Sequence, residues 1–480
     1  MERSKFHNDN RSVLNTDAFD KRRFKEIFEM SKGLQKIRDK GVLQTFEPLL
    51  ADIWASLYKM KPEITAVVVD NDLIINKLLM ERIMSDESFE NFRSFTRLDD
   101  VSSAIGTMKF GEKTNEWMAD QKAQDEDLHK LMQEIHAMLG HLQEQKWQEG
   151  AEKDNQTLEE TLRQATAKLN EKLKQTLRNN SQSFSQAMAQ AMQETKQVKE
   201  GLKSLLGGSS TGRGDVDVKK VPLRDQLALA EKISTDKKMK EIADWAGRFK
   251  QIARKKQKSK HSESVERRGV TLGNDMERLL PMEFALYMHP ISKKDFLRRL
   301  VEGQAMQFKQ KGREVLEKGP IVFCLDQSGS MNKLDTQSKG FILALMSIAR
   351  KQRRDFCLIV FSTRTQIYQY KKGNMKASDM VRLARTFLGG GTNFALPLDE
   401  AVNIINESRY KQADVVFVTD GEDRVKESFL EAFNKKKKEK SFNVLSLVIG
   451  CSTDTVEQFS DKVVQVKDFD DEGSFIAFEI

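Results

Sequence analysis

Residues 321–330, Ile-Val-Phe-Cys-Leu-Asp-Gln-Ser-Gly-Ser, decide the fold of the C-terminal third of this chain. Five consecutive apolar residues predict a strand that is buried on both faces, and the polar residues after Leu325 predict a loop. A helical pattern follows from Leu334 to Arg350. A buried strand, a loop and a helix form the repeating unit of a parallel sheet that helices cover on both faces.

The same order of strand, loop and helix continues to the C-terminus. Further strands are predicted at Phe356 to Phe361, Ile367 to Tyr370 (a short edge strand), Val415 to Val418, Val444 to Ile449 and Val463 to Val466. Helices are predicted at Met380 to Leu388, Leu398 to Ile405 and Lys426 to Phe433. We therefore predict a doubly wound α/β domain with a mostly parallel sheet over residues 315–480.

Oxygen-bearing side chains follow two of these strands at their carboxyl ends. Asp326, Ser328 and Ser330 end or follow the first strand, Asp420 follows a later one, and Thr392 lies in a glycine-rich loop between them. Ligands of doubly wound domains bind at this edge, where the strand order reverses, so we expect the five side chains to converge. Two carboxylates and three hydroxyls favour Mg²⁺ or Mn²⁺ over zinc. An Asp or Glu of a partner is the natural further ligand.

The pattern resembles the metal-ion-dependent adhesion site of the von Willebrand factor A family, written Asp-x-Ser-x-Ser, then a distant Thr, then an Asp. All five positions match. The resemblance implies direct metal contacts from Ser328, Ser330 and Thr392, while Asp326 and Asp420 act partly through water. The alternative is a polar loop in which Ser330 only caps the following helix.

Two enzymatic interpretations are disfavoured by the residues themselves. A haloacid-dehalogenase-type phosphatase needs a second Asp two residues after the first, where Ser328 stands. A serine hydrolase needs Gly-x-Ser-x-Gly and a later histidine, yet no histidine follows His289. We therefore predict that the protein is not an enzyme and has no catalytic residue.

The chain before residue 315 is predicted to be helical. Helical spacing of apolar residues predicts an N-terminal helical domain over residues 1–120. Steps of three and four between apolar residues predict long coiled-coil hairpins over residues 121–206. The Gly/Ser-rich residues 207–218 predict a flexible linker, and residues 219–314 predict a basic helical segment.

Charge and metal-ligand residues in this half give weaker signals. Residues 219–270 carry 16 Lys and Arg against 7 Asp and Glu, an excess that suits an anionic lipid surface or a solvated helix face, with nucleic acid disfavoured. His129, His136 and His141 are spaced by seven and five residues rather than the four that a helical zinc site needs, so we expect them to be solvated or to face a partner.

Composition gives the expected location of the protein. The three cysteines, Cys324, Cys357 and Cys451, form no disulfide framework and are expected to be reduced and buried. The N-terminus lacks a signal-like apolar segment, and no stretch reaches the roughly 18 apolar residues of a membrane span. We expect a cytoplasmic protein, with the inner face of the membrane as a second, peripheral location.

The order of domains resembles the ViaA-like partners of MoxR-type AAA+ ATPases. Residues 269–281 and 296–303, and Gly319-Pro320, carry this narrower resemblance. It implies an adaptor or regulator that binds a hexameric AAA+ ATPase and links it to client proteins. The alternatives are the integrator subunit of a metal chelatase, although its acidic, Pro-rich linker is not evident here, and a peripheral membrane protein that uses the basic segment.

Overall fold

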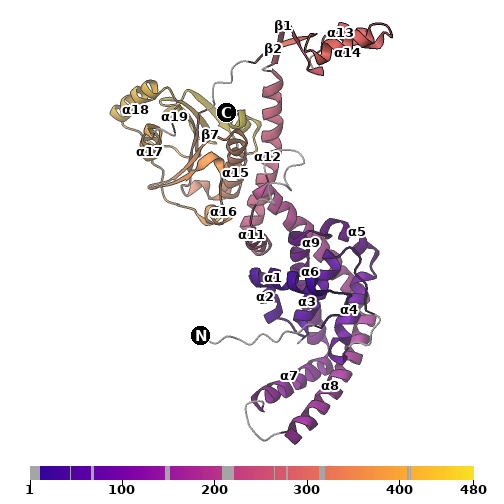
Figure 1. The fold of residues 1–480 in the computed structure, drawn as a ribbon. Coiled ribbons are helices and arrows are strands. Elements are labelled where there is room, and N and C mark those ends of the chain that lie inside the picture. Colours follow the sequence, from indigo (N-terminus) through magenta and orange to yellow (C-terminus); the bar gives the residue numbers. More distant parts are fainter. Residues whose placement is uncertain are drawn as a thin grey trace. The chain divides into compact units, whose positions relative to one another are not determined.

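The computed structural model describes residues 11–43, 45–65, 70–145, 152–207, 221–263, 265–276, 279–312, 319–407, 410 and 412–479. The chain divides into two compact units (Figure 1). The first comprises Met1–Gly207 and Asp215–Lys240, and the second comprises Gly208–Gly214 and Glu241–Ile480. Apart from Gly207, the predicted linker 207–218 lies outside the described residues.

The first unit is helical, as predicted. Its elements are α1 (Ala18–Met30), α2 (Lys32–Asp39), α3 (Phe46–Tyr58), the 3-10 turn η1 (Asn71–Leu73), α4 (Ile74–Met84), α5 (Glu87–Thr96), α6 (Asp100–Gln124), α7 (Glu126–Gln145), α8 (Glu152–Asn179), α9 (Ser181–Leu206) and α11 (Leu223–Thr235). Helix α6 begins at a side-chain cap, because the Asp99 carboxylate accepts hydrogen bonds from the backbone N–H groups of Val101 and Ser102. The core includes the fully buried rings of Trp54 and Phe110.

Helices α7 and α8 pack against each other over the stretch predicted as a hairpin. Leu128 and Met132 of α7 and Leu169 and Leu173 of α8 are buried. One ring nitrogen of His129 lies 2.9 Å from the side-chain nitrogen of Gln133. The side chains of His136 and His141 lie outside the described residues. No group of three or more His, Cys, Asp or Glu side chains that could hold a metal ion occurs in the part of the chain that is described.

A buried carboxylate in α3 gives the first unit a pH-dependent stability. Asp52 accepts a hydrogen bond from the Val13 N–H at 3.2 Å and one from the Ser12 hydroxyl. Burial raises the pKa of Asp52 to about 6, above its ordinary value of 3.8. The folded state therefore binds a proton that the unfolded state has already released, and this stabilisation is lost as the pH rises through about 6.

We expect Asp52→Asn to raise the stability of the first unit at pH 8, where the native carboxylate is charged and buried. The gain is on the order of 2 to 3 kcal/mol, and it disappears near pH 4. Urea unfolding at pH 4 to 8 measures it. The control is Asp120→Asn, which changes an exposed carboxylate of α6. Equal pH profiles for the native chain and Asp52→Asn would contradict the prediction.

The second unit contains the predicted α/β domain, and its six-stranded sheet has the order β5-β4-β3-β6-β7-β8. The strands are β3 (Ile321–Asp326), β4 (Phe356–Phe361), β5 (Thr365–Tyr370), β6 (Asp414–Thr419), β7 (Asn443–Ile449) and β8 (Lys462–Val466). All neighbouring pairs are parallel except β4 and β5. The four central strands are almost entirely buried, which explains their continuous apolar runs.

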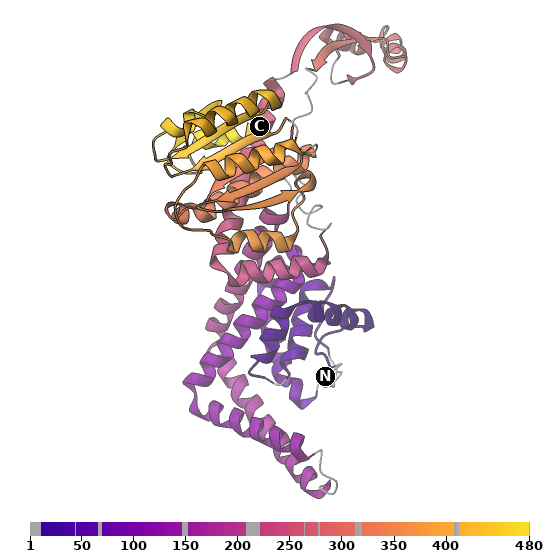
Figure 2. The same cartoon turned by 90° about the vertical axis from the view of Figure 1, so that its left-hand side faces the viewer.

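Helices cover both faces of this sheet, as Figures 1 and 2 show. They are α15 (Asp335–Gln352), α16 (Ala377–Arg385), α17 (Ala395–Asn406), α18 (Glu427–Lys440) and α19 (Asp454–Glu457), with the 3-10 turns η3 (Ser330–Leu334), η4 (Lys371–Gly373) and η6 (Glu472–Glu479). The prediction of a doubly wound, mostly parallel domain is confirmed.

Helix α12 (Lys237–Glu263) adds a further layer from the basic segment. From Glu241 on it belongs to the second unit. The ring of Phe249 lies 5.4 Å from that of Phe341 on α15, and a Cβ added to Gly340 would lie only 2.5 Å from the Cβ of Trp245. The two helices therefore approach closely because position 340 has no side chain.

Residues 265–312 differ from the helical prediction. β1 (Val265–Gly273) and β2 (Ala305–Gly312) pair as an antiparallel ribbon, with α13 (Pro281–Met288) and α14 (Lys293–Val301) between them. Gly269, at φ +88°, lies in a register shift between Arg267 and Val270. The bulge lies inside β1, whose residues pair with β2 on both sides of it, and a glycine at position 269 accommodates the positive φ.

This ribbon and its two helices, residues 265–312, form the β1–β2 module. Its buried core is small and consists of Leu279, Phe296 and Ala305. By contrast, Met288 is 79% exposed and Ile291 is 86% exposed. Large apolar side chains in contact with water are typical of a binding surface. Among the described helices, none is both long enough and apolar enough to cross a membrane.

Candidate metal centre

The centre lies where the strand order reverses. From β3 the chain continues to β4 on one side of β3, and β6 later forms on the other side of β3. β3 and β6 are parallel neighbours, with Leu325 opposite Val418. Their carboxyl ends therefore meet at one edge of the sheet. Asp326 is the last residue of β3, and Asp420 directly follows β6. This register brings the two predicted carboxylates to the same place.

The two serines and the second aspartate form a chain of short contacts. The hydroxyl oxygens of Ser328 and Ser330 lie 3.0 Å apart. The Ser330 hydroxyl donates to a carboxylate oxygen of Asp420 at 2.7 Å. Ser328 is buried, whereas Ser330 is exposed. The cluster therefore opens to solvent at Ser330, where an outside ligand has access.

Asp326 is fully buried and is held by hydrogen bonds on both oxygens. One oxygen accepts from the Ser328 N–H at 2.8 Å, and the other accepts from the Thr419 hydroxyl at 2.6 Å. Thr419 in turn accepts from the Gly421 N–H at 3.0 Å. Thr419 was not among the residues predicted from the sequence, although its place directly before Asp420 was an available signal. Thr419 fixes the orientation of the Asp326 carboxylate.

Thr392 reaches the cluster through the glycine-rich loop. A Cβ added to Gly421 would lie 2.8 Å from the Thr392 hydroxyl oxygen and 3.5 Å from a carboxylate oxygen of Asp326. The loop is attached to the residues after β3, because the Gly390 carbonyl accepts from the Gly329 N–H at 2.9 Å. Gly390 has φ +89°, which explains the need for glycine there. The structure thus brings all five predicted side chains together.

The electrostatics of the cluster favour a bound cation. Burial raises the pKa of Asp326, as the nearby Asp420 also does to a smaller extent, and burial raises the pKa of Asp420. In the described ranges, no Lys or Arg forms an ion pair with either carboxylate. Two carboxylates without a positive neighbour leave an uncompensated charge, which a divalent ion offsets.

The donor set and spacing fit Mg²⁺. Magnesium binds oxygens at about 2.0–2.1 Å in an octahedron, so adjacent ligand oxygens lie about 3 Å apart. The Ser328–Ser330 and Ser330–Asp420 contacts, at 3.0 Å and 2.7 Å, are close to that edge length. The nearby Cys451 thiol donates to the Gly421 carbonyl at 3.3 Å, and burial raises its pKa to about 11.

Gly421→Ala tests the close approach at Thr392. We expect the new methyl group to push the Thr392 hydroxyl out of the cluster and to weaken Mg²⁺ binding about tenfold, with little loss of fold stability. Isothermal titration calorimetry measures the change. In the control Gly391→Ala, the new methyl group meets only the Thr363 methyl at 3.7 Å, an ordinary contact. Equal Mg²⁺ affinity in both variants would rule out a role for Thr392.

Comparisons with known proteins agree with the fold of this domain. Residues 321–422 match the family model of the von Willebrand factor type A domain. An uncharacterized protein of Methanocaldococcus jannaschii is 28% identical over 471 residues, which cover 96% of this chain and 98% of that protein. The regulatory protein ViaA of Proteus mirabilis is 32% identical over 169 residues, which cover 32% of this chain and 35% of ViaA.

One solved structure, a von Willebrand factor type A protein from Catenulispora acidiphila, covers 34% of this chain with a TM-score of 0.27 and 15% sequence identity; the match takes in 41% of that protein.

Proposed function

Because the second unit of this chain contains a von Willebrand factor type A domain, we propose that the protein is a non-enzymatic regulatory adaptor that binds a protein partner through a divalent cation. The observation that carries the proposal is the convergence of Ser328, Ser330 and Asp420 within hydrogen-bond distance at an exposed edge of the sheet. Its similarity to ViaA, a regulatory protein by name, supports the regulatory role.

The resemblance to the metal-ion-dependent adhesion site implies the roles of the five residues. Ser328, Ser330 and Thr392 are neutral donors and would contact the ion directly, while the carboxylates of Asp326 and Asp420 balance its charge, partly through water. Since only two carboxylates face the ion, a bound Mg²⁺ keeps enough electrophilic character to take a carboxylate oxygen of a partner. The open side at Ser330 is where that Asp or Glu would bind. The chemistry of this centre is recognition, and we assign no catalytic residue.

The proposed partner is a MoxR-type AAA+ ATPase. This assignment rests on the resemblance to the ViaA-like proteins. The β1–β2 module supports a protein-binding role, because its exposed Met288 and Ile291 offer apolar contact area to a partner. The metal centre by itself offers no such apolar area. In this proposal the ATPase supplies the nucleotide chemistry, and the adaptor regulates it.

Affinity capture from native lysate tests the proposal. The full-length chain is used as bait in Mg²⁺ buffer and in EDTA, and the captured proteins are identified by mass spectrometry. We expect an AAA+ ATPase in the Mg²⁺ eluate and its loss in EDTA. Capture of the same ATPase in both buffers would rule out the cation as the link, and absence of any ATPase in Mg²⁺ would rule out the assigned partner.

A further inference from the structure

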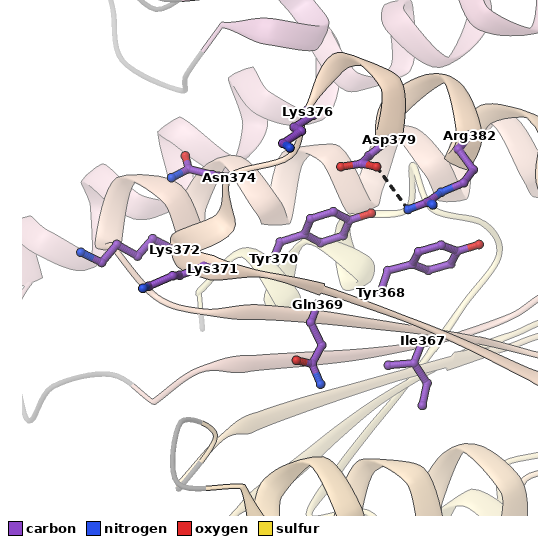
Figure 3. Close-up of a pocket in the computed structure, with 10 residues that line it drawn as sticks. All are labelled: Ile367, Tyr368, Gln369, Tyr370, Lys371, Lys372, Asn374, Lys376, Asp379 and Arg382. Atoms are coloured by element: carbon purple, nitrogen blue, oxygen red, sulfur yellow. Dashed lines mark hydrogen bonds and ion pairs between the residues drawn. The ribbon is translucent and has the colours of Figure 1, made fainter.

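The open edge of the sheet carries a second concave surface on the same domain. Among the described strands β5 pairs with β4 alone, so its other side presents backbone groups that no described strand pairs. A cavity of about 500 Å³ runs along this edge. It is lined by Ile367, Tyr368, Gln369, Tyr370, Lys371, Lys372, Asn374, Lys376, Asp379 and Arg382 (Figure 3). We call this surface the β5 edge pocket.

The pocket follows the strand rather than one of its faces. Four consecutive residues of β5, from Ile367 to Tyr370, line it. In Figure 3, Tyr368 and Tyr370 point towards α16, and Ile367 and Gln369 point to the opposite side of the strand. Side chains of both sets line the pocket. Four residues of a strand span about 14 Å, which suits an extended chain better than a single small anion.

The charge of the pocket is strongly positive. Lys371, Lys372 and Lys376 are exposed, and in the described part of the chain no carboxylate pairs with them. The acidic residue of the lining, Asp379, is already paired with Arg382 at 3.2 Å. The Arg382 guanidinium also lies over the Tyr368 ring, 5.0 Å from its centroid. The three lysines are therefore available to an outside anion.

The turn that carries two of these lysines is fixed in place. Lys372 has φ +51°, and its N–H donates to the Asp355 carboxylate at 2.7 Å. A Cβ on Gly373 would lie 2.6 Å from the backbone nitrogen of Arg350 on α15. A left-handed lysine followed by a glycine packed against α15 holds the turn rigidly. A fixed backbone at a binding surface loses less entropy on binding than a mobile one.

We propose that the β5 edge pocket binds an extended acidic segment of a partner protein, which adds to β5 as a further strand. The carboxylates of that segment lie beside Lys371, Lys372 and Lys376, and its alternate side chains lie on the Ile367 side of the sheet. Main-chain hydrogen bonds to β5 give affinity, and the lysines select acidic sequences. This site is separate from the metal centre and does not use the cation.

The test measures binding of synthetic peptides to the full-length chain by fluorescence anisotropy in EDTA, which removes any contribution from the metal centre. The probe is an eight-residue peptide that alternates Glu and Val. We expect Lys371→Glu/Lys372→Glu/Lys376→Glu to weaken its binding at least about tenfold and to bind the matching Lys/Val peptide instead. The control Lys435→Glu/Lys436→Glu/Lys438→Glu reverses three exposed charges of α18, none of which lines the pocket.

Two further probes separate strand addition from simple charge attraction. A Glu/Val peptide with alternate amides N-methylated keeps its charge but loses main-chain donors, and we expect it to bind at least about tenfold more weakly. A single-stranded oligonucleotide of similar charge is expected not to compete. Equal binding of the methylated peptide, effective competition by the oligonucleotide, or equal losses in the pocket and α18 variants would overturn the proposal. Thermal melting confirms that both variants fold.

Discussion

The Ser328→Ala/Ser330→Ala variant is expected to bind Mg²⁺ at least about 100-fold more weakly than the native chain and to lose cation-dependent partner binding. Both hydroxyl oxygens belong to the cluster at the end of β3, and they lie 3.0 Å apart. Removing them leaves two carboxylates with only Thr392 as a neutral donor. Isothermal titration calorimetry with Mg²⁺, followed by capture of the ATPase, measures both losses.

A matched control removes two hydroxyls elsewhere in the domain. Ser378 of α16 and Ser428 of α18 are exposed, so Ser378→Ala/Ser428→Ala keeps the cluster intact. We expect native Mg²⁺ affinity for this control. If the serine pair at the cluster is replaced and Mg²⁺ still binds with native affinity, the centre assigned here does not hold the ion. If Mg²⁺ binding is lost but the partner still binds, the cation is not the contact.

Phe341→Ala is expected to produce the largest loss of stability, about 3 to 5 kcal/mol in the second unit. The ring is fully buried on α15. It contacts Phe249 of α12 at 5.4 Å between ring centroids and Phe478 of η6 at 4.6 Å. Removal of the ring leaves a cavity between α12, α15 and η6, and a small shift of these three elements cannot fill it. Urea unfolding of the full-length chain, followed by near-ultraviolet circular dichroism, measures the loss.

The same chemical change at an exposed site serves as the control. Phe284 of α13 is 43% exposed, so Phe284→Ala removes a ring that is already partly in water. We expect a loss below about 1 kcal/mol. Similar losses for both variants would show that α12 and η6 do not depend on Phe341, and the packing described for the second unit would then be wrong.

The sequence by itself determined the α/β domain and the residues that meet at one edge of its sheet. Continuous apolar runs such as Ile321–Leu325 are stable as strands that are buried on both faces of a parallel sheet. Polar residues at the carboxyl ends of these strands must then lie at the same edge of the sheet. The convergence of Asp326 with Asp420 follows from this rule, since they stand at the carboxyl ends of β3 and β6, which are parallel neighbours. Metal binding itself stays a prediction.

Tertiary structure alone decided what surrounds those residues. The bond from Thr419 to Asp326 joins strands that are 93 positions apart in the chain. The packing of Phe249 on α15 depends on the missing side chain at Gly340. The pocket beside β5 exists because α16 and a left-handed turn at Lys372 meet the open strand edge. The local spacing of apolar residues indicates the secondary structure of each segment. The contacts above depend instead on which distant segments of the chain the folded structure brings together.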